Sequence, residues 1–182
     1  LALVGSVTLV GAGLLAFVQD DIKKVLAYST VSQLGYMVMA LGVGAWTAAV
    51  FHLFTHAFFK AGLFLGAGSV SHSVHSFDMK KSMGGMRKFM PTTYKTFIIC
   101  SIALMGLPPL AGFWSKDEIL LAAWNENKIA WAMLLIAAIM TAFYMSRLVF
   151  MTFFGEKKWG TLEHEETEAD VETEADEEPD AG

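Results

Sequence analysis

Long apolar stretches alternate with short polar connections along most of the sequence. At about 20 residues each, five of these stretches are long enough to cross a bilayer as helices: 1–18, 25–45, 46–70, 94–124 and 129–153. The first, third and last connections together carry eight Lys or Arg residues, whereas the other two carry one. Because basic residues concentrate on the cytoplasmic side, this pattern predicts an all-α membrane protein with five transmembrane helices and those three connections in the cytoplasm.

The fourth stretch, 94–124, is predicted to be a discontinuous helix. Pro108 and Pro109 remove two backbone donors and clash with the preceding turn, so the helix must break there. Ser115 and Glu118 follow with the spacing of a capping box, which predicts that a second half-helix begins at Ser115. Broken helices at membrane depth occur where they line a polar cavity, and in transporters they mark the ion site.

Lys116 directly follows this predicted N-cap. At that position the positive end of the half-helix dipole and burial would both disfavour its charged form. A lysine that releases and regains a proton suits a proton relay, although a lysine that extends to the membrane surface fits the same pattern. Asp117 is either a first-turn cap of the same half-helix or the counter-ion of a lysine on another helix.

Three polar side chains, His52, His56 and Lys60, repeat every four residues within the apolar stretch 46–70. Residues four apart lie on one face of a helix, so the sequence predicts one polar stripe through a membrane span. A metal site would need further ligands, and a bis-histidine haem would need imidazoles that face each other from two helices. Histidines with a structural hydrogen-bonding role and histidines along a proton path both fit the pattern better than a metal or haem site. Lys60 favours the path, because a protonated lysine cannot bind a metal.

Other polar or small residues in the apolar stretches are weaker candidates. The segment 20–24 combines an acidic helix cap with cytoplasmic lysines. Arg147 is predicted to be a buried cation deep in the last stretch, and Gly62 with Gly66 forms a small face for a neighbouring helix. Four polar residues of the second stretch suit either interhelical hydrogen bonds or a wet access channel: Ser29, Thr30, Ser32 and Gln33.

Composition separates a membrane body from an acidic end. Hydrophobic residues make up 54% of the chain, and the mean hydropathy is +0.47. Eleven of the 18 acidic residues lie in 163–180, so the net charge of -5 combines a tail of -11 with a remainder of +6. We expect a membrane domain at 1–155 and an acidic, disordered tail at 156–182. The first residue is Leu1 rather than Met, which suggests an internal fragment of a longer protein.

Four sequence motifs resemble one known family. They are DDIKKVLAYSTVSQLGYM at 20–37, HLFTHAFFKAGLFLGAGSV at 52–70, MGGMRKFMP at 83–91 and LPPLAGFWSKDEIL at 107–120. In this order they are similar to the antiporter-like proton-channel subunit L, or chain 5, of respiratory complex I, NADH:quinone oxidoreductase. The resemblance runs from about 5 to 155 and implies the second of two inverted five-helix repeats, with the first repeat outside this chain.

The resemblance also implies roles for individual residues. Lys60 would be the connecting lysine of a central hydrophilic axis, and Lys116 the terminal lysine on the broken helix. His52 and His56 would lie along the path between them. Two further residues would form an access or gating pair: Asp21 and Lys23. The implied function is proton translocation by a non-redox subunit, coupled to quinone reduction elsewhere in the complex.

No cofactor is expected in this chain. Cys100 is its only cysteine, which excludes disulfides, Cys-ligated zinc and iron–sulfur clusters within the chain. The resemblance implies that FMN, iron–sulfur clusters and quinone are held by other subunits. It implies as partners the other complex I membrane subunits, especially a neighbouring antiporter-like subunit, together with the lipid bilayer and protons, and no nucleic acid. The expected location is a bacterial or archaeal cell membrane, or an organellar inner membrane.

Related assemblies and other classes of protein remain as alternatives. Multi-subunit sodium/proton antiporters and membrane-bound hydrogenases share the same module, so either could contain a chain of this kind. A haem-binding membrane electron carrier would need facing histidines. A purely structural membrane anchor would tolerate replacement of Lys60 and Lys116.

Overall fold

The computed structural model describes residues 1–159, which form seven helices and no strand. The helices are α1 (Ala2–Val18), α2 (Ile22–Gly42), α3 (Trp46–Val74), α4 (Met79–Ser82), α5 (Pro91–Met105), α6 (Ala111–Glu126) and α7 (Lys128–Phe153). The predicted all-α fold is thereby confirmed. The predicted disordered tail lies almost entirely outside the described residues.

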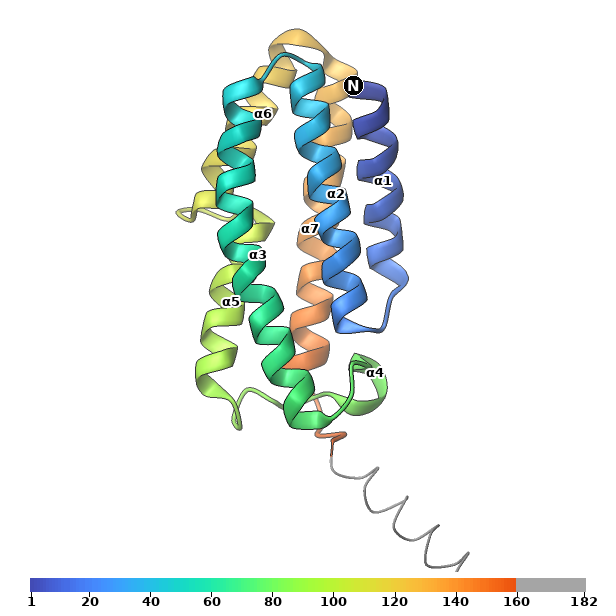
Figure 1. Cartoon of the computed structure of the whole chain (residues 1–182), viewed down its shortest axis with the longest axis vertical. Helices are drawn as coiled ribbons and strands as arrows, with labels where there is room; N and C mark the ends of the chain where they lie inside the picture. Colours follow the sequence, from blue (N-terminus) through green and yellow to red (C-terminus); the bar gives the residue numbers. More distant parts are fainter. Residues whose placement is uncertain (160–182) are drawn as a thin grey trace, which may run out of the picture.

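The helices form one elongated bundle. Figure 1 shows α1, α2, α3 and α7 running along its length, while α5 and α6 follow one another along the same height. By length and composition, three helices of the described part could cross a membrane, namely α2, α3 and α7, and α1 is apolar but has 17 residues. With 15 and 16 residues, α5 and α6 are each too short to span a bilayer alone. Together they occupy the place of the fourth predicted helix.

The helix break lies between α5 and α6, where the two prolines predicted it. Gly106 ends α5 in the left-handed conformation, with φ 83°, which a residue without a side chain adopts at no steric cost. The segment 106–110 contains both prolines, and α6 begins at Ala111. The predicted discontinuous helix is therefore confirmed.

The predicted capping box at Ser115 is wrong. The N-cap of α6 is Leu110, whose extended backbone lets the helix resume directly after Pro109, without a side-chain cap. Ser115 lies in the second turn of α6 and is fully buried. Its hydroxyl contacts the carbonyl oxygen of Gly112, at 3.4 Å, instead of a free backbone N–H group. The N-cap of the second half-helix thus lies five residues earlier than expected.

Glycines allow the two halves of the broken helix and their neighbour α3 to pack closely. The α carbon of Gly112 faces the carbonyl oxygen of Ala103 in α5, and any Cβ atom there would overlap it. On α3, Gly62 faces Cys100, and Gly66 faces Phe97, both on α5. The small face predicted on α3 is therefore confirmed, and α5 is the helix that approaches it.

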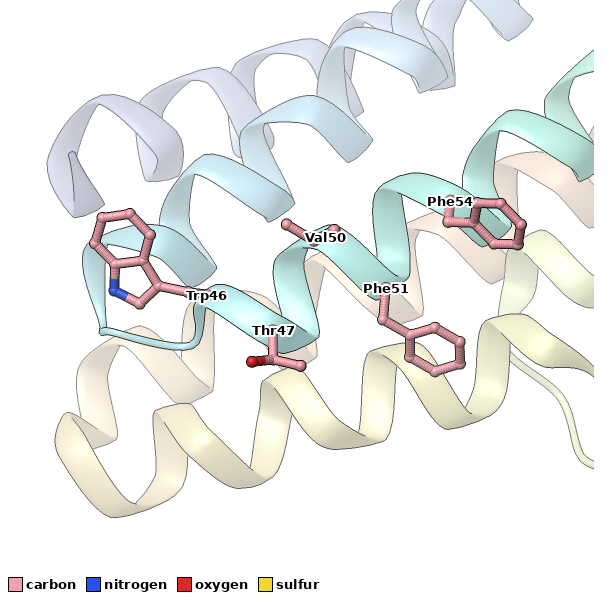
Figure 2. A pocket seen from close by; sticks show the side chains of 5 residues that line it. All are labelled: Trp46, Thr47, Val50, Phe51 and Phe54. Atoms are coloured by element: carbon pink, nitrogen blue, oxygen red, sulfur yellow. The ribbon is translucent and has the colours of Figure 1, made fainter.

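An apolar pocket of about 580 Å³ opens on the outer side of α3. Its lining residues all come from the first part of that helix: Trp46, Thr47, Val50, Phe51 and Phe54 (Figure 2). None of them belongs to the polar stripe. The candidate site lies instead on the buried face of α3.

Candidate functional site

The polar stripe of α3 lies inside the bundle. His52 has no exposed surface, and His56 and Lys60 are each 5% exposed. Large apolar side chains such as Phe54 and Phe58 cover the outer face of the same helix. The sequence prediction of a single polar face is therefore confirmed, because its spacing of four residues directs all three side chains toward the bundle interior.

Lys60 is bound by residues of α2. Its Nζ atom donates to the carbonyl oxygen of Leu26 at 3.1 Å and to Ser29 Oγ at 2.8 Å. Ser29 Oγ in turn lies 2.8 Å from the hydroxyl of Tyr144 on α7. Hydrogen bonds to a buried ammonium offset part of the cost of removing its charge from water.

His52 contacts two other helices through its two ring nitrogens and reaches a third through Gln33. Nδ1 lies 2.7 Å from Ser115 Oγ on α6, and Nε2 lies 3.0 Å from Gln33 Oε1 on α2. The Gln33 amide Nε2 then donates to Thr141 Oγ1 on α7 at 3.1 Å. The four elements α2, α3, α6 and α7 are thus joined by polar side chains in the bundle centre.

The polar residues of α2 mainly make interhelical hydrogen bonds, one of the two uses predicted for them. Ser29 and Gln33 reach α7, and Ser32 Oγ donates to the carbonyl oxygen of Leu9 in α1 at 2.9 Å. Thr30 differs, since its hydroxyl donates to Leu26 of its own helix. Sequence reasoning missed their partners Thr141 and Tyr144, although two polar residues three apart in an apolar helix were a usable signal.

His56 differs from His52 in its hydrogen bonding. It packs against Phe59, with ring centroids 5.5 Å apart, and lies within electrostatic reach of both Lys60 and Lys116. Its Nε2 atom is buried and makes no hydrogen bond to any residue that the structure describes. A buried nitrogen of this kind is costly without a partner, so this position suits a group that exchanges hydrogen bonds during function.

Lys116 is buried, at 4% exposed, and its environment differs from the predicted one. Its Nζ atom donates to the carbonyl oxygen of Leu104 at 2.6 Å, in the last turn of α5. The last carbonyl groups of a helix lack intrahelical donors and carry partial negative charge. The expected position at the positive end of α6 is therefore wrong, because α6 begins before Lys116 and α5 ends beside it.

In the described part of the chain, residues 1–159, the side chains of Asp21 and Lys23 do not form the predicted ion pair with each other. Asp21 is the N-cap of α2 and accepts from the backbone N–H group of Lys24 at 3.0 Å. The Lys23 ammonium instead lies 3.9 Å from the ring centroid of Phe77. The acidic cap predicted for segment 20–24 is confirmed, whereas a role of the two residues in proton access stays a prediction. Asp117 is exposed on α6 and forms no ion pair with a described lysine.

Arg147 is not a deeply buried cation. Its side chain is 27% exposed, and NH2 forms an ion pair with Asp20 Oδ1 at 2.6 Å. NH1 donates to the carbonyl oxygen of Gln19 at 2.7 Å. The long side chain reaches the connection between α1 and α2, so Arg147 ties α7 to that end of the bundle.

Replacing Asp21 separates its two possible roles. Asn is also a good N-cap, so Asp21→Asn should keep both the helix and proton transport close to the wild-type level. Asp21→Ala should destabilise the start of α2 by about 1 kcal/mol, because it removes the cap. The measurement is transport in vesicles together with the thermal stability of the assembled complex. Loss of transport in a stable Asp21→Asn variant would support the access pair instead.

No group of three His, Cys, Asp or Glu side chains able to hold a metal ion occurs within the part of the chain that is described. His52 and His56 lie on one helix, with ring centroids 6.2 Å apart, and do not face each other across two helices. The described geometry places the protonatable side chains His52, His56 and Lys60 in a row along the bundle interior.

Comparison with known proteins identifies the family. The model of the family described as NADH:quinone oxidoreductase/Mrp antiporter, TM, matches residues 1–142. The chain belongs to this family. The match covers α1 to α6 and the first part of α7, which includes both stripe histidines and both buried lysines.

Individual members of the family agree with this assignment. The chain is 53% identical over 165 residues to NAD(P)H-quinone oxidoreductase chain 5 of Picosynechococcus, covering 86% of this chain and 25% of that protein. It is 50% identical over 158 residues to NADH-quinone oxidoreductase subunit L of Rickettsia bellii, covering 87% of this chain and 24% of that protein. The chain therefore spans about a quarter of the length of these relatives, and the resemblance seen in the four motifs is confirmed.

A solved structure supports the fold. The chain is similar to a chain in the structure of the Mrp complex from a Dietzia species, with a TM-score of 0.79 and 27% sequence identity. The match covers 86% of this chain and 30% of that chain. The bundle with its broken helix is thus a fold of the antiporter-like family.

Proposed function

We propose that this chain is part of a proton-translocating membrane subunit of an NADH:quinone oxidoreductase. The observation that carries the proposal is the burial of Lys60 and Lys116 in one apolar bundle that also buries His52 and His56. A lysine near the bilayer centre is disfavoured by about 3 kcal/mol on insertion scales, so such residues are retained for function. Relatives named subunit L and chain 5, each about half identical to this chain, support the assignment.

The mechanism we propose is electrostatic. Lys60 and Lys116 interact with each other and both act on His56, so a proton on Lys60 disfavours a second positive charge on Lys116. His56, with its free Nε2 atom, would exchange a proton with the lysines through channel water. Lys116 would then release its proton along the broken helix. The contact with Leu104 would hold the ammonium until that release.

The redox chemistry would take place in other subunits. FMN, iron–sulfur clusters and quinone would be bound there, and this chain would act as a non-redox part of the translocating enzyme. Its partners would be other membrane subunits of the complex, especially a neighbouring antiporter-like subunit. The remaining three quarters of the subunit would supply the other half of the channel. The membrane would be a bacterial or archaeal cell membrane, or an organellar inner membrane.

Replacing Lys60 by Met in the full-length subunit tests the proposal. Met keeps the apolar stem and is only one atom shorter, but it carries no exchangeable proton, so NADH-driven proton transport into vesicles should fall about tenfold or more. A pH-sensitive dye reports the transport. Lys95→Met is the matched control, because Lys95 is exposed on α5 and outside the polar stripe. Full transport by an assembled Lys60→Met variant would overturn the proposed function.

A sodium/proton antiporter subunit is the second candidate, favoured by the structural similarity to the Mrp complex. The two functions differ in what drives proton movement. A complex I subunit needs NADH oxidation, whereas an antiporter moves protons in response to a sodium gradient alone. Sodium-driven alkalinisation or acidification of vesicles in the absence of NADH would identify the antiporter.

A further inference from the structure

Two series of hydrogen bonds meet at Thr141. The first runs from Lys60 Nζ to Ser29 Oγ at 2.8 Å, then to Tyr144 OH at 2.8 Å, and from there to Thr141 Oγ1 at 3.4 Å. The second runs from Ser115 through His52 and Gln33 to the same oxygen. The polar core therefore connects Lys60 with Ser115, the residue next to Lys116, by an unbroken series of contacts.

The direction of these bonds prevents proton conduction through the series. Thr141 has one hydroxyl hydrogen, which it donates to the carbonyl oxygen of Ala137 at 2.8 Å. Tyr144 and Gln33 both donate to Thr141 Oγ1, so Thr141 accepts from both sides and donates to neither. A proton relay requires each member to accept on one side and donate on the other. A proton therefore cannot pass from one series to the other through Thr141.

Gln33 adds a second interruption. Its Oε1 atom faces His52 Nε2, which places the ring hydrogen on Nε2 and leaves Nδ1 to accept from Ser115. An amide has no acidic or basic group near neutral pH and passes a proton only through a high-energy imidic acid form. Gln33 thus fixes one tautomer of His52 and blocks transfer from His52 toward Tyr144.

We propose that Gln33 and Thr141 form an insulating junction, which separates the Lys60–Ser29–Tyr144 branch from His52 and so prevents protons from bypassing His56. This inference rests on the proposed function and adds a positioning role for two residues that carry no charge. The junction confines proton exchange between Lys60 and Lys116 to the side of His56. A channel that must couple proton release to a distant reaction needs such insulation, because a permanent proton wire would dissipate the gradient.

Gln33→Glu tests the junction in the full-length subunit within its assembled complex. The carboxyl group occupies nearly the same volume and can both accept and donate a proton. Because the side chain at position 33 also lies within hydrogen-bond reach of the Tyr144 hydroxyl, the introduced carboxyl group would link His52 to Tyr144 without passing through Thr141. Reconstituted vesicles with an imposed pH gradient and no NADH should lose that gradient about tenfold faster than wild type, since a positioned protonatable group changes proton-transfer rates by tens of times or more. Gln33→Leu removes the same contacts without a protonatable group and should not leak.

A double variant separates conduction from loosened packing. If the Gln33→Glu leak runs through His52, adding His52→Gln should abolish it. Gln33→Asn is the second single variant, because it introduces no charge and its shorter amide cannot bridge His52 and Thr141, so water should enter and produce a smaller leak. Equal leaks in Gln33→Glu and Gln33→Leu, a wild-type rate in an assembled Gln33→Glu variant, or a leak that persists without His52 would each overturn the junction.

The outcome is independent of the Lys60 experiment. A lost transport signal in Lys60→Met combined with a tight Gln33→Glu variant would refute the junction alone. Full transport in Lys60→Met would refute the proposed function, and with it the need for insulation. Thr30→Val is the control for loss of a hydroxyl on α2, because Thr30 is partly buried and bonds to Leu26 of its own helix, and it should not leak.

Discussion

Proton transport should fall to background when Lys116 is replaced by Met in the full-length subunit. The Nζ atom of Lys116 is the only protonatable group placed on the broken helix inside the bundle, at 4% exposed, within the residues that the structure describes. Met retains the apolar stem, so packing against Gly106 is preserved, but the proton site is lost. NADH-driven acidification of vesicles, followed with a pH-sensitive dye, measures the effect.

Two further variants make the Lys116 experiment decisive. Lys128→Met removes an exposed lysine at the start of α7 and should transport normally. Lys116→Arg keeps a positive charge but does not release a proton near neutral pH, so it should assemble and yet transport poorly. Normal transport by assembled Lys116→Met would show that this lysine serves only to bind the end of α5.

Gly112→Val should prevent accumulation of the folded subunit. The new Cβ atom would overlap the backbone oxygen of Ala103, and it would also lie 3.6 Å from Cε1 of Phe59. Overpacking against side chains commonly costs about 1–3 kcal/mol, and a backbone group on α5 yields less readily than a side chain. The amount of assembled complex in native gels should therefore fall sharply, and Gly112→Ala should show a weaker form of the same defect.

Gly68→Val is the matched control for this prediction. A Cβ atom at Gly68 of α3 would have no neighbour within 4 Å, so the same β-branched residue enters a helix there without a steric clash. Accumulation should remain near wild type. Equal accumulation of the Gly112 and Gly68 variants would show that α5 and α6 can separate without loss of the fold.

Much of the fold was predictable because the bilayer imposes it. Apolar runs of membrane length located α1, α2, α3 and α7 within a few residues, and the two prolines located the break. The stripe of His52, His56 and Lys60 was predictable for a similar reason, since a spacing of four residues has one meaning on a helix. These features could therefore be predicted from short stretches of the sequence alone.

The surroundings of Lys116 could not be read from the sequence. Where a helix resumes after a proline depends on backbone conformation, and the extended Leu110 allowed α6 to begin before Ser115. The partner of Lys116 is a backbone carbonyl oxygen of Leu104, and carbonyl groups occur at every position. The capping motif alone therefore predicted Lys116 at the N-terminal end of α6, whereas the structure places its Nζ atom at the C-terminal end of α5.

Long-range contacts account for the other differences. Arg147 lies within the last apolar stretch, yet its flexible side chain reaches Asp20 on the connection between α1 and α2. Tyr144 and Thr141 join the polar core through α2 residues more than 100 positions earlier in the chain. Periodicity within one helix contains no information about which distant helix faces it.

The bonds between α2 and α7 also set an order for biogenesis. Gln33 and Thr141 are 108 positions apart, and Ser29 and Tyr144 are 115 apart. At about 5–20 residues per second, translation separates the appearance of these partners by roughly 5–20 s. During that interval Ser29 can already bind Lys60, and Gln33 can already bind His52, both on α3. The remaining bonds of Ser29 and Gln33, to Tyr144 and Thr141, form only when α7 has emerged from the ribosome and inserted beside α2.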